Sequence, residues 1–385
     1  MAGWELKPEE MEEIARKLVR ESLRLGRKPD GKFDSVRIAY NSTDPSCVEF
    51  ALKFEEECWR VGVHTLLVPY SSLRSKLKFS ITPDESLAEM DPLAEALAKT
   101  VDATVFIGEE DDPNWGRDLT QKIKLSAPNK QKLREIIDER KVRWLYVGWP
   151  IPGAAAGYGC SVEDFRRIFF NSIRESFSEK LRRLCSYYRE ALEGRDRVTV
   201  RAPDGTELTF EIKGRPVLVD DGLISDEDLA RGDVGLNIPC GEVFLAPLEE
   251  TAEGKIVFEH VVIPGFGKIR GLKLTFKEGK VVEYEAVEGR EVFSRFLEAN
   301  TGEKDRIAEL GIGCNPGAEY TGGSIIVDEK IYGTIHIAIG NNTGAYHGKN
   351  KASSHLDMIK SMEKGGELIV DGETIMRNGK PVKQI

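Results

Sequence analysis

The sequence has few histidines, no paired cysteine motif and no phosphate-binding loop. Its six cysteines show no CxxC spacing, which argues against a zinc knuckle and against a disulfide framework. No GxGxxG or GxxxxGK motif follows a predicted strand, so nucleotide binding has no support. The net charge is −10, and no basic stripe stands clear of acidic neighbours. A nucleic-acid partner is therefore not expected.

Long apolar runs are also missing. No run is long enough to span a bilayer, and the N-terminal segment has no signal-like apolar core. We therefore expect a soluble, cytoplasmic protein without a membrane partner. With 385 residues, the chain is long enough for two domains that each have a substantial core.

The N-terminal half alternates predicted helices with predicted strands. A helix is expected over residues 8–26, between Pro8 and Gly26. Apolar β-branched runs then predict four strands, which are separated by helices near 47–61, 84–99 and 129–139. These strands are 35–42, 64–70, 103–109 and 142–149. Strands separated by helices indicate a mostly parallel sheet with covered faces.

The pattern changes after a long predicted helix that starts at the capping residue Ser161 and ends at Gly194. We place the domain boundary there, which gives an α/β domain over 1–195 and a second domain over 196–385. Period-two runs in the second domain predict strands and a β-rich α+β fold. The runs are 198–203, 207–213, 242–247, 255–263, 271–276, 281–287, 324–330, 334–340, 367–372 and 373–379.

Histidine is scarce but clustered. Three of the five histidines, His336, His347 and His355, lie within the second domain's last third. His336 is the only titratable side chain in the apolar run 333–339, so its buried imidazole needs a partner. His355 and Asp357 are two residues apart and project from one face of an extended segment. Imidazole and carboxylate together suit zinc, manganese, cobalt or iron(II). A hydrogen-bonded core His336 with an unrelated surface pair is the alternative.

Two glutamates extend this candidate metal site. Glu242 lies directly before a hydrophobic run, and Glu309 opens the segment AELGIGCNPG, whose glycines permit close backbone approach. Together with His336, His355 and Asp357 they offer enough ligands to bridge two divalent ions. Such a pair of ions is typical of a co-catalytic hydrolase site.

Four ordered motifs carry a family resemblance: NIPCGEVFLAP, AELGIGCN, DEKIYGTIHIAIG and HLDM. Together they resemble the thermophilic metallo-aminopeptidases, the family of aminopeptidase T, aminopeptidase S and similar leucyl aminopeptidases. The resemblance implies a two-domain, homodimeric aminopeptidase with a dinuclear metal site. The family's metal ligands fall on Glu242, Glu309, His336, His355 and Asp357.

The sequence departs from the family pattern in its site loop. The family often has a tyrosine seven residues after the strand histidine, where this chain has Thr343. Tyr346 can take that role if the loop 341–348 folds back, and His347 is the competing candidate. A solvated loop without a role is the third possibility.

Two cysteines also replace family residues. Cys240 stands in place of an acidic residue and Cys314 in place of a threonine. Each is either a packing residue or an additional thiolate ligand for zinc.

These observations predict a metal-dependent aminopeptidase that removes N-terminal residues from short peptides. Two zinc, cobalt or manganese ions would share a hydroxide and polarise the scissile carbonyl. Glu309 is the candidate bridging carboxylate, and Glu329 is either a general base or the partner of Lys330 in a surface ion pair. The alternative is a mononuclear iron(II) ring-cleaving dioxygenase that uses His336, His355 and Asp357. A non-catalytic, metal-stabilised dimer is a third interpretation.

Overall fold

The computed structural model describes residues 4–383, which form two compact units. The first unit contains the described residues up to Phe170 together with Gly222–Ile238. The second unit contains Asn171–Asp221 and the described residues from Pro239 onward. The predicted domains 1–195 and 196–385 divide the chain at a different place and stay a prediction.

The first unit is built on a five-stranded parallel sheet with the strand order β2-β1-β3-β4-β8. The mostly parallel sheet expected for the N-terminal half is therefore confirmed. Its last strand comes from the segment that returns to this unit after residue 221 and was not predicted. The strands are β1 (Ser35–Asn41), β2 (His64–Tyr70), β3 (Ala103–Ile107), β4 (Arg143–Val147) and β8 (Gly235–Ile238).

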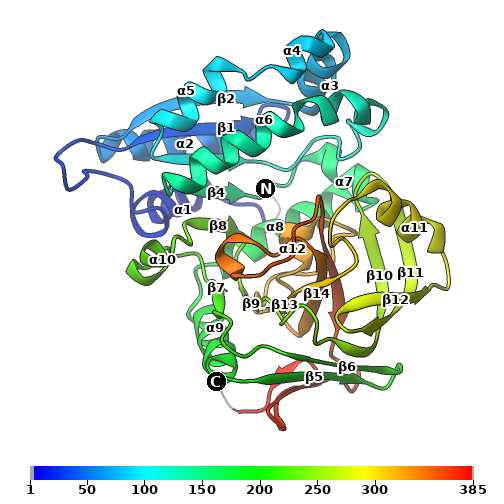
Figure 1. Ribbon diagram of the computed structural model, residues 1–385. Helices are drawn as coiled ribbons and strands as arrows, with labels where there is room; N and C mark the ends of the chain where they lie inside the picture. The colour runs from blue at the N-terminus through cyan, green and yellow to red at the C-terminus, as the bar shows by residue number, and fades with distance from the viewer. Residues whose placement is uncertain (1–3, 384–385) are drawn as a thin grey trace. The chain divides into compact units, whose positions relative to one another are not determined.

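Helices connect these strands, and α6 lies beside α4 and α5 (Figure 1). The side chain of Asp44 caps α2 by accepting hydrogen bonds from the backbone N–H groups of Ser46 and Cys47. The helices are α1 (Pro8–Lys17), η1 (Leu18–Ser22), α2 (Pro45–Arg60), α3 (Ser72–Ile81), α4 (Asp84–Ala88), α5 (Pro92–Thr100), η2 (Arg117–Leu119), α6 (Thr120–Glu139), α7 (Pro152–Tyr158) and α10 (Asp226–Arg231).

Three predicted helices have different limits. The helix expected over 8–26 consists of α1 followed by the π-helix η1, and it ends shortly before Arg24, which has a positive φ of 54°. The helix expected near 84–99 is two helices, because Pro92 keeps the preceding Asp91 extended and that side chain caps α5. The helix expected near 129–139 is the second half of α6, which contains Pro128.

The long helix expected over 161–194 is also two helices, α8 (Val162–Glu175) and α9 (Glu179–Leu192). Ser178 caps α9 by accepting from the N–H of Leu181, and the hydroxyl of Ser176 accepts from the N–H of Cys240. The cap at Ser178 starts a new helix, although the apolar periodicity of the sequence continues across the break.

The second unit contains two antiparallel sheets (Figure 1), which agrees with the β-rich composition expected from the period-two pattern. One has the order β12-β11-β10-β6-β5-β16-β17-β18, and the other has the order β15-β14-β13-β9-β7. The strands are β5 (Arg197–Ala202), β6 (Thr206–Glu211), β7 (Leu218–Asp220), β9 (Glu242–Leu245), β10 (Glu253–Ile263), β11 (Gly267–Lys277), β12 (Lys280–Glu285), β13 (Ile307–Gly313), β14 (Thr334–Gly340), β15 (His355–Ser361), β16 (Glu367–Val370), β17 (Glu373–Arg377) and β18 (Lys380–Pro381).

Short helices interrupt these sheets: α11 (Arg290–Ala299), which packs on β11, α12 (Ile325–Asp328) and η3 (Gly344–Tyr346). The strand predicted over 324–330 is wrong, because this segment forms α12. The carboxylate of Asp328 accepts hydrogen bonds from the backbone N–H groups of Thr321 and Gly323, which closes the segment on itself.

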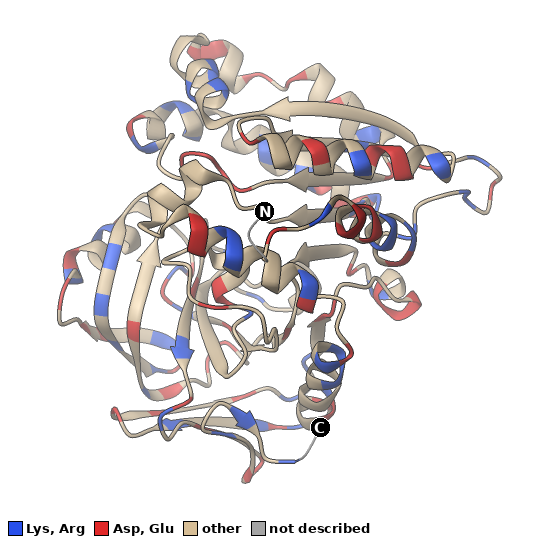
Figure 2. Cartoon of the chain, turned by 180° about the vertical axis from the view of Figure 1, so that it is seen from behind, with Lys and Arg blue, Asp and Glu red and all other residues tan. Residues whose placement is uncertain are grey.

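Within residues 4–383, no helix has the length and apolar character needed to cross a bilayer. Figure 2 shows basic and acidic residues interspersed along the helices and strands rather than gathered in one basic stripe.

Candidate metal centre

The five predicted ligands lie on one face of the five-stranded antiparallel sheet. Glu242 begins β9, Glu309 lies in β13, His336 lies in β14, and His355 and Asp357 lie in β15. Directly opposite residues of an antiparallel pair share a face. Ala338 of β14 pairs with Glu309 of β13 on one side and with Asp357 of β15 on the other. Both ligands therefore lie on the same face of the sheet as His336, which is two residues before Ala338 in β14.

Small residues stand opposite these ligands. A Cβ atom at Gly311 would lie 2.0 Å from ring atoms of His336, so only glycine leaves room for this imidazole. The expectation that the glycines of AELGIG permit close approach is thereby confirmed. The cross-strand pairs are Gly311 with His336, Gly313 with Glu242, Gly340 with His355, and Ala338 with Glu309 and Asp357.

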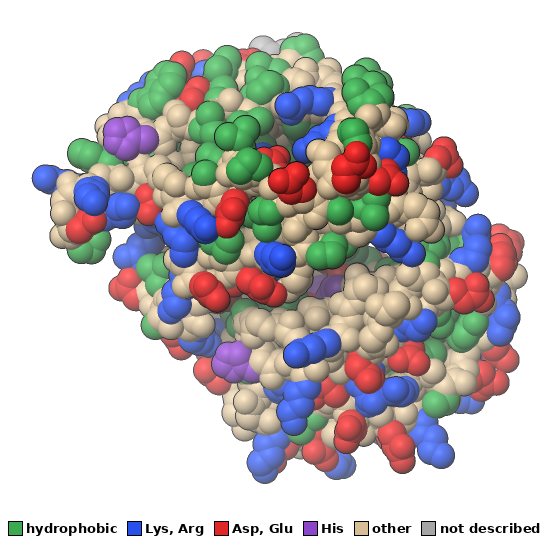
Figure 3. Space-filling model, turned by 45° about the horizontal axis from the view of Figure 1, so that its top comes forward, with side chains coloured by type: hydrophobic (Ala, Val, Ile, Leu, Met, Phe, Trp, Pro, Cys, Tyr) green, Lys and Arg blue, Asp and Glu red, His purple; other side chains and the backbone are tan. Residues whose placement is uncertain are grey.

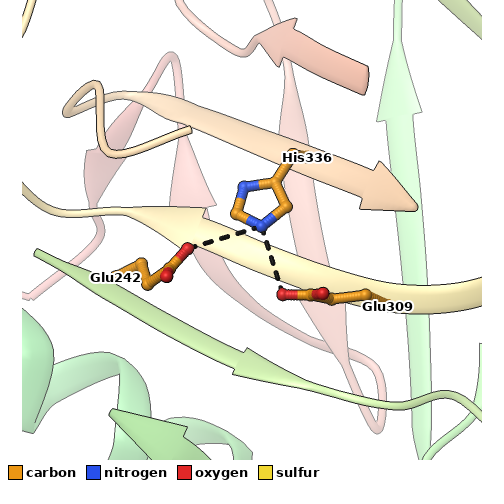
Figure 4. A group of neighbouring side chains, drawn as sticks. All are labelled: Glu242, Glu309 and His336. Atoms are coloured by element: carbon orange, nitrogen blue, oxygen red, sulfur yellow. Dashed lines mark hydrogen bonds and ion pairs between the residues drawn. The ribbon is translucent and has the colours of Figure 1, made fainter. Parts of the chain in front are cut away.

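One group of candidate ligands consists of Glu242, Glu309 and His336, all buried. The Nε2 atom of His336 lies 3.3 Å from Oε1 of Glu309 and 3.5 Å from Oε2 of Glu242 (Figure 4). One donor atom from each residue lies within 4.8 Å of the others. These side chains converge from three neighbouring strands on one point.

The second group consists of Glu309, His355 and Asp357. The Nε2 atom of His355 lies 3.0 Å from Oε2 of Glu309 and 3.2 Å from Oδ1 of Asp357. Its Nδ1 atom lies 2.7 Å from the carbonyl oxygen of Asn341, which orients the ring and directs Nε2 toward the carboxylates. Glu309 therefore belongs to both groups and offers a different oxygen to each.

The electrostatics of the site show an excess of buried negative charge. Burial raises the pKa of Glu242 to about 8, although Lys330 opposes the shift. Burial would lower the pKa of His336, but hydrogen bonding and charge from Glu309 outweigh it and raise the pKa to about 9. Burial would raise the pKa of Glu309, but His336 and His355 outweigh it and lower the pKa. Protonated imidazoles thus supply positive charge that divalent cations can supply instead, so the donor set fits such ions.

Lys330 is a residue of this site that the sequence did not identify. It is 0% exposed, and its Nζ atom donates to Oε1 of Glu242 at 2.6 Å and to Oε1 of Glu329. Asp220 Oδ2 lies 3.8 Å away. The ion pair between Glu329 and Lys330 that was the alternative prediction does form, but it is buried and not on the surface. Because Lys330 holds one oxygen of Glu242, the other oxygen is left to face His336.

Lys330→Met is expected to destabilise the metal-free protein by about 3–5 kcal/mol, because it leaves buried carboxylates without their cation. Chemical denaturation in the presence of a chelator measures this loss. Lys360→Met is the matched control, since Lys360 is also buried but pairs with the exposed carboxylate of Asp204. Its expected cost is about 1–2 kcal/mol, and equal losses in the two variants would contradict the argument.

The loop after β14 folds back, as the Tyr346 hypothesis requires. The hydroxyl of Tyr346 donates to Oε2 of Glu309 at 3.0 Å, and its ring lies near that of His355 with centroids 6.1 Å apart. The hydroxyl of Thr343 instead bonds to Oδ1 of Asn341 at 3.3 Å. The side chain of His347 is exposed. Of the two candidate residues, Tyr346 and His347, it is Tyr346 whose side chain contacts a predicted ligand.

Cys240 and Cys314 are packing residues in this geometry. Both are buried, and neither belongs to the two ligand groups found among residues 4–383. Their thiols donate to the carbonyl oxygens of Ser176 and Ile312, each at 3.4 Å. Burial raises the pKa of the Cys240 thiol, which favours its neutral form over a metal-binding thiolate.

The sequence pattern of the thermophilic metalloprotease (M29) family matches residues 9–380. Aminopeptidase AmpS of Bacillus subtilis (strain 168) is 22% identical over 254 residues, which are 59% of this chain and 60% of AmpS. The alignment therefore spans less than two thirds of this curated relative's length.

Two solved structures share the fold. AmpT from Thermus thermophilus has a TM-score of 0.73 and 21% identity, with 97% of this chain and 99% of that chain covered. A 2,5-dihydroxypridine dioxygenase from Pseudomonas putida KT2440 has a TM-score of 0.64 and 16% identity, with 99% of each chain covered. At these identities the likeness concerns the fold alone. The family pattern, in contrast, covers nearly the whole sequence and confirms the resemblance of the four motifs, so the chain belongs to the thermophilic metalloprotease (M29) family.

Proposed function

We propose that this protein is a metal-dependent aminopeptidase that removes N-terminal residues from short peptides at a dinuclear site. The observation that carries the proposal is the position of Glu309, whose two oxygens face two different histidines. A carboxylate shared in this way is suited to bridge two cations. Membership of a metalloprotease family supports the hydrolytic class.

Each remaining ligand has a place in this proposal. Glu242 and His336 would complete one coordination sphere, and His355 and Asp357 would complete the other. Two bound divalent ions, whether zinc, cobalt or manganese, supply a Lewis acid and lower the pKa of water.

Glu329 is the proposed general base. Its carboxylate is mostly buried and is oriented by Lys330. Burial raises its pKa, although Lys330 opposes the shift. A carboxylate with a raised pKa can accept a proton from water and pass it to the leaving amine.

Tyr346 is the proposed hydrogen-bond donor to the transition state. Its hydroxyl already lies at the carboxylate shared by the two ligand groups. Tyr346→Phe is expected to lower kcat by about tenfold to a thousandfold with little change in metal content, because one transition-state hydrogen bond is lost. Steady-state kinetics with parallel metal analysis measures both. If Tyr346→Phe kept the parental kcat while His347→Ala were inactive, the role would belong to His347. Thr343→Val serves as the matched control in the same loop.

The mononuclear iron(II) dioxygenase is the second candidate, and the shared fold with a dioxygenase favours it. Glu242 argues against it, because His336, His355 and Asp357 alone complete a two-histidine, one-carboxylate triad. A panel of aminoacyl-anilides, assayed together with oxygen uptake on a dihydroxypyridine, separates the two activities. Hydrolysis without oxygen uptake supports the aminopeptidase, and the reverse result refutes it.

We also propose a homodimer. Apart from the exposed Val162, the large aliphatic residues and the phenylalanines of α8 and α9 are buried within the chain itself. Figure 3 shows exposed apolar side chains gathered over the first unit instead. Those with the largest exposure on α3 and α5 are Leu73, Leu77, Ile81 and Leu93. Leu73, Leu77 and Ile81 recur every four residues and therefore lie along one face of α3, and exposed apolar surface of this kind is typical of an interface. Light scattering that gives a monomer mass would refute the dimer.

A cytoplasmic location stays a prediction.

A further inference from the structure

A buried ion pair lies behind the loop that carries Tyr346. Arg215 follows β6 and Glu249 follows β9, and Nη2 of the arginine lies 2.5 Å from Oε2 of the glutamate. Their side chains are only 6% and 9% exposed. Neither residue belongs to the candidate ligand groups, so the proposed chemistry leaves this pair without a role.

Both partners also hydrogen-bond to the loop itself. Nη1 of Arg215 donates to the carbonyl oxygen of His347, the residue directly after Tyr346. Oε1 of Glu249 accepts from the backbone N–H of Lys349 at 2.7 Å. The pair therefore holds the backbone on both sides of Gly348.

The loop is closed on itself by a buried asparagine. The carbonyl oxygen of Asn342 accepts from the N–H of Gly348 at 3.0 Å, and its Oδ1 accepts from the N–H of Asn350 at 2.8 Å. The Nδ2 atom of Asn342 donates to Oε1 of Glu249 at 3.3 Å. His347 has a φ of 55°, a left-handed conformation that residues other than glycine rarely adopt. Such a conformation is held by contacts from other segments, and Arg215 and Glu249 supply them through His347 and Lys349.

We propose that Arg215 and Glu249 are positioning residues that clamp loop 342–350 and thereby direct the Tyr346 hydroxyl to Glu309. The role assigned to the phenol rests on the proposed peptidase function, whereas the clamp itself is a property of the loop. Neither side chain touches substrate in this scheme, because each acts through the backbone next to Tyr346.

The test is the double replacement Arg215→Met with Glu249→Leu. Removing both charges together leaves no unpaired buried ion, so the fold is preserved better than by either single change. Hydrogen exchange should become at least about tenfold faster at the amides of His347, Gly348 and Asn350. None of these amides donates to Arg215 or Glu249 directly, so faster exchange there reports release of the whole loop.

The kinetic part of the test is a cycle with Tyr346→Phe. In the clamp variant kcat should fall by about tenfold to a hundredfold, with metal stoichiometry unchanged. Adding Tyr346→Phe to that variant should lower kcat by less than about threefold, because the phenol is already displaced. The proposal would be overturned if hydrogen exchange at these loop amides were unchanged in the clamp variant. It would also be overturned if Tyr346→Phe lowered kcat in the clamp variant as much as in the parent protein.

A matched control is available in the first unit, where Arg143 and Asp34 form a comparable buried pair at 2.6 Å. Arg143→Met with Asp34→Leu should leave both kcat and the exchange of residues 347–350 at the parental values. If the parent protein hydrolyses no anilide, the proposed function fails, but the exchange measurement still decides whether the clamp exists.

Discussion

Glu309→Gln is expected to lower kcat for peptide hydrolysis by at least about a thousandfold, the largest effect of any single substitution considered. Glutamine fills the same space, but it is neutral and offers only one oxygen. It therefore cannot serve both His336 and His355 as the carboxylate does. Thermal stability should change little because the side chain keeps its volume. Anilide kinetics and a thermal melt of the same preparation measure the two quantities.

Two further variants make this result interpretable. Asp357→Asn affects only the group that contains Glu309 and His355, so it should lose one equivalent of metal and retain the other. Glu283→Gln, at an exposed position of β12, should behave like the parent. Activity that survives in Glu309→Gln would place the bridging ligand elsewhere.

Removal of metal by a chelator is expected to abolish activity while the circular dichroism spectrum is largely retained. The two units each contain a buried apolar core, which should keep the fold without bound metal. Activity should return in proportion to added zinc, cobalt or manganese and reach its plateau near two equivalents per chain.

The metal titration also discriminates between the candidate reactions. A plateau at one equivalent, with iron preferred and oxygen consumed, would contradict the dinuclear hydrolase and support the dioxygenase. Loss of the circular dichroism spectrum on chelation would show instead that the ions are structural.

The candidate ligands could be found from the sequence because their chemistry is unusual for their surroundings. A lone histidine in a β-branched strand and a histidine two residues from an aspartate both stand out without knowledge of the fold. Four of the five strands of the parallel sheet in the first unit were likewise predictable, since they carry apolar runs between helices.

Features that depend on contacts between distant segments could not be found in this way. Lys330 follows two acidic residues and looks like a surface turn, and only the approach of Glu242 from another strand makes it a buried cation. Ser178 starts a new helix inside an uninterrupted apolar periodicity, and residues 324–330 have strand composition but close into α12. Lys330 thus depends on a contact between distant segments, whereas in the other two cases local hydrogen bonds from a serine or an aspartate side chain outweigh the apolar pattern.

The bulge in β13 has a consequence for any attempt to transplant this site. Ile307 pairs with Ile339 but Glu309 pairs with Ala338, so one extra residue, Ala308, lies between them. In a regular strand Ile307 and Glu309 would point to the same side, whereas the bulge sends the isoleucine to one face and the glutamate to the other. Residues 309–312 pair in regular register with residues 335–338, so a graft without the bulge would keep Glu309 in phase with His336 but would turn the Ile307 side chain onto the ligand face. The extra residue Ala308 thus keeps an isoleucine side chain away from the carboxylates and imidazoles of the candidate site.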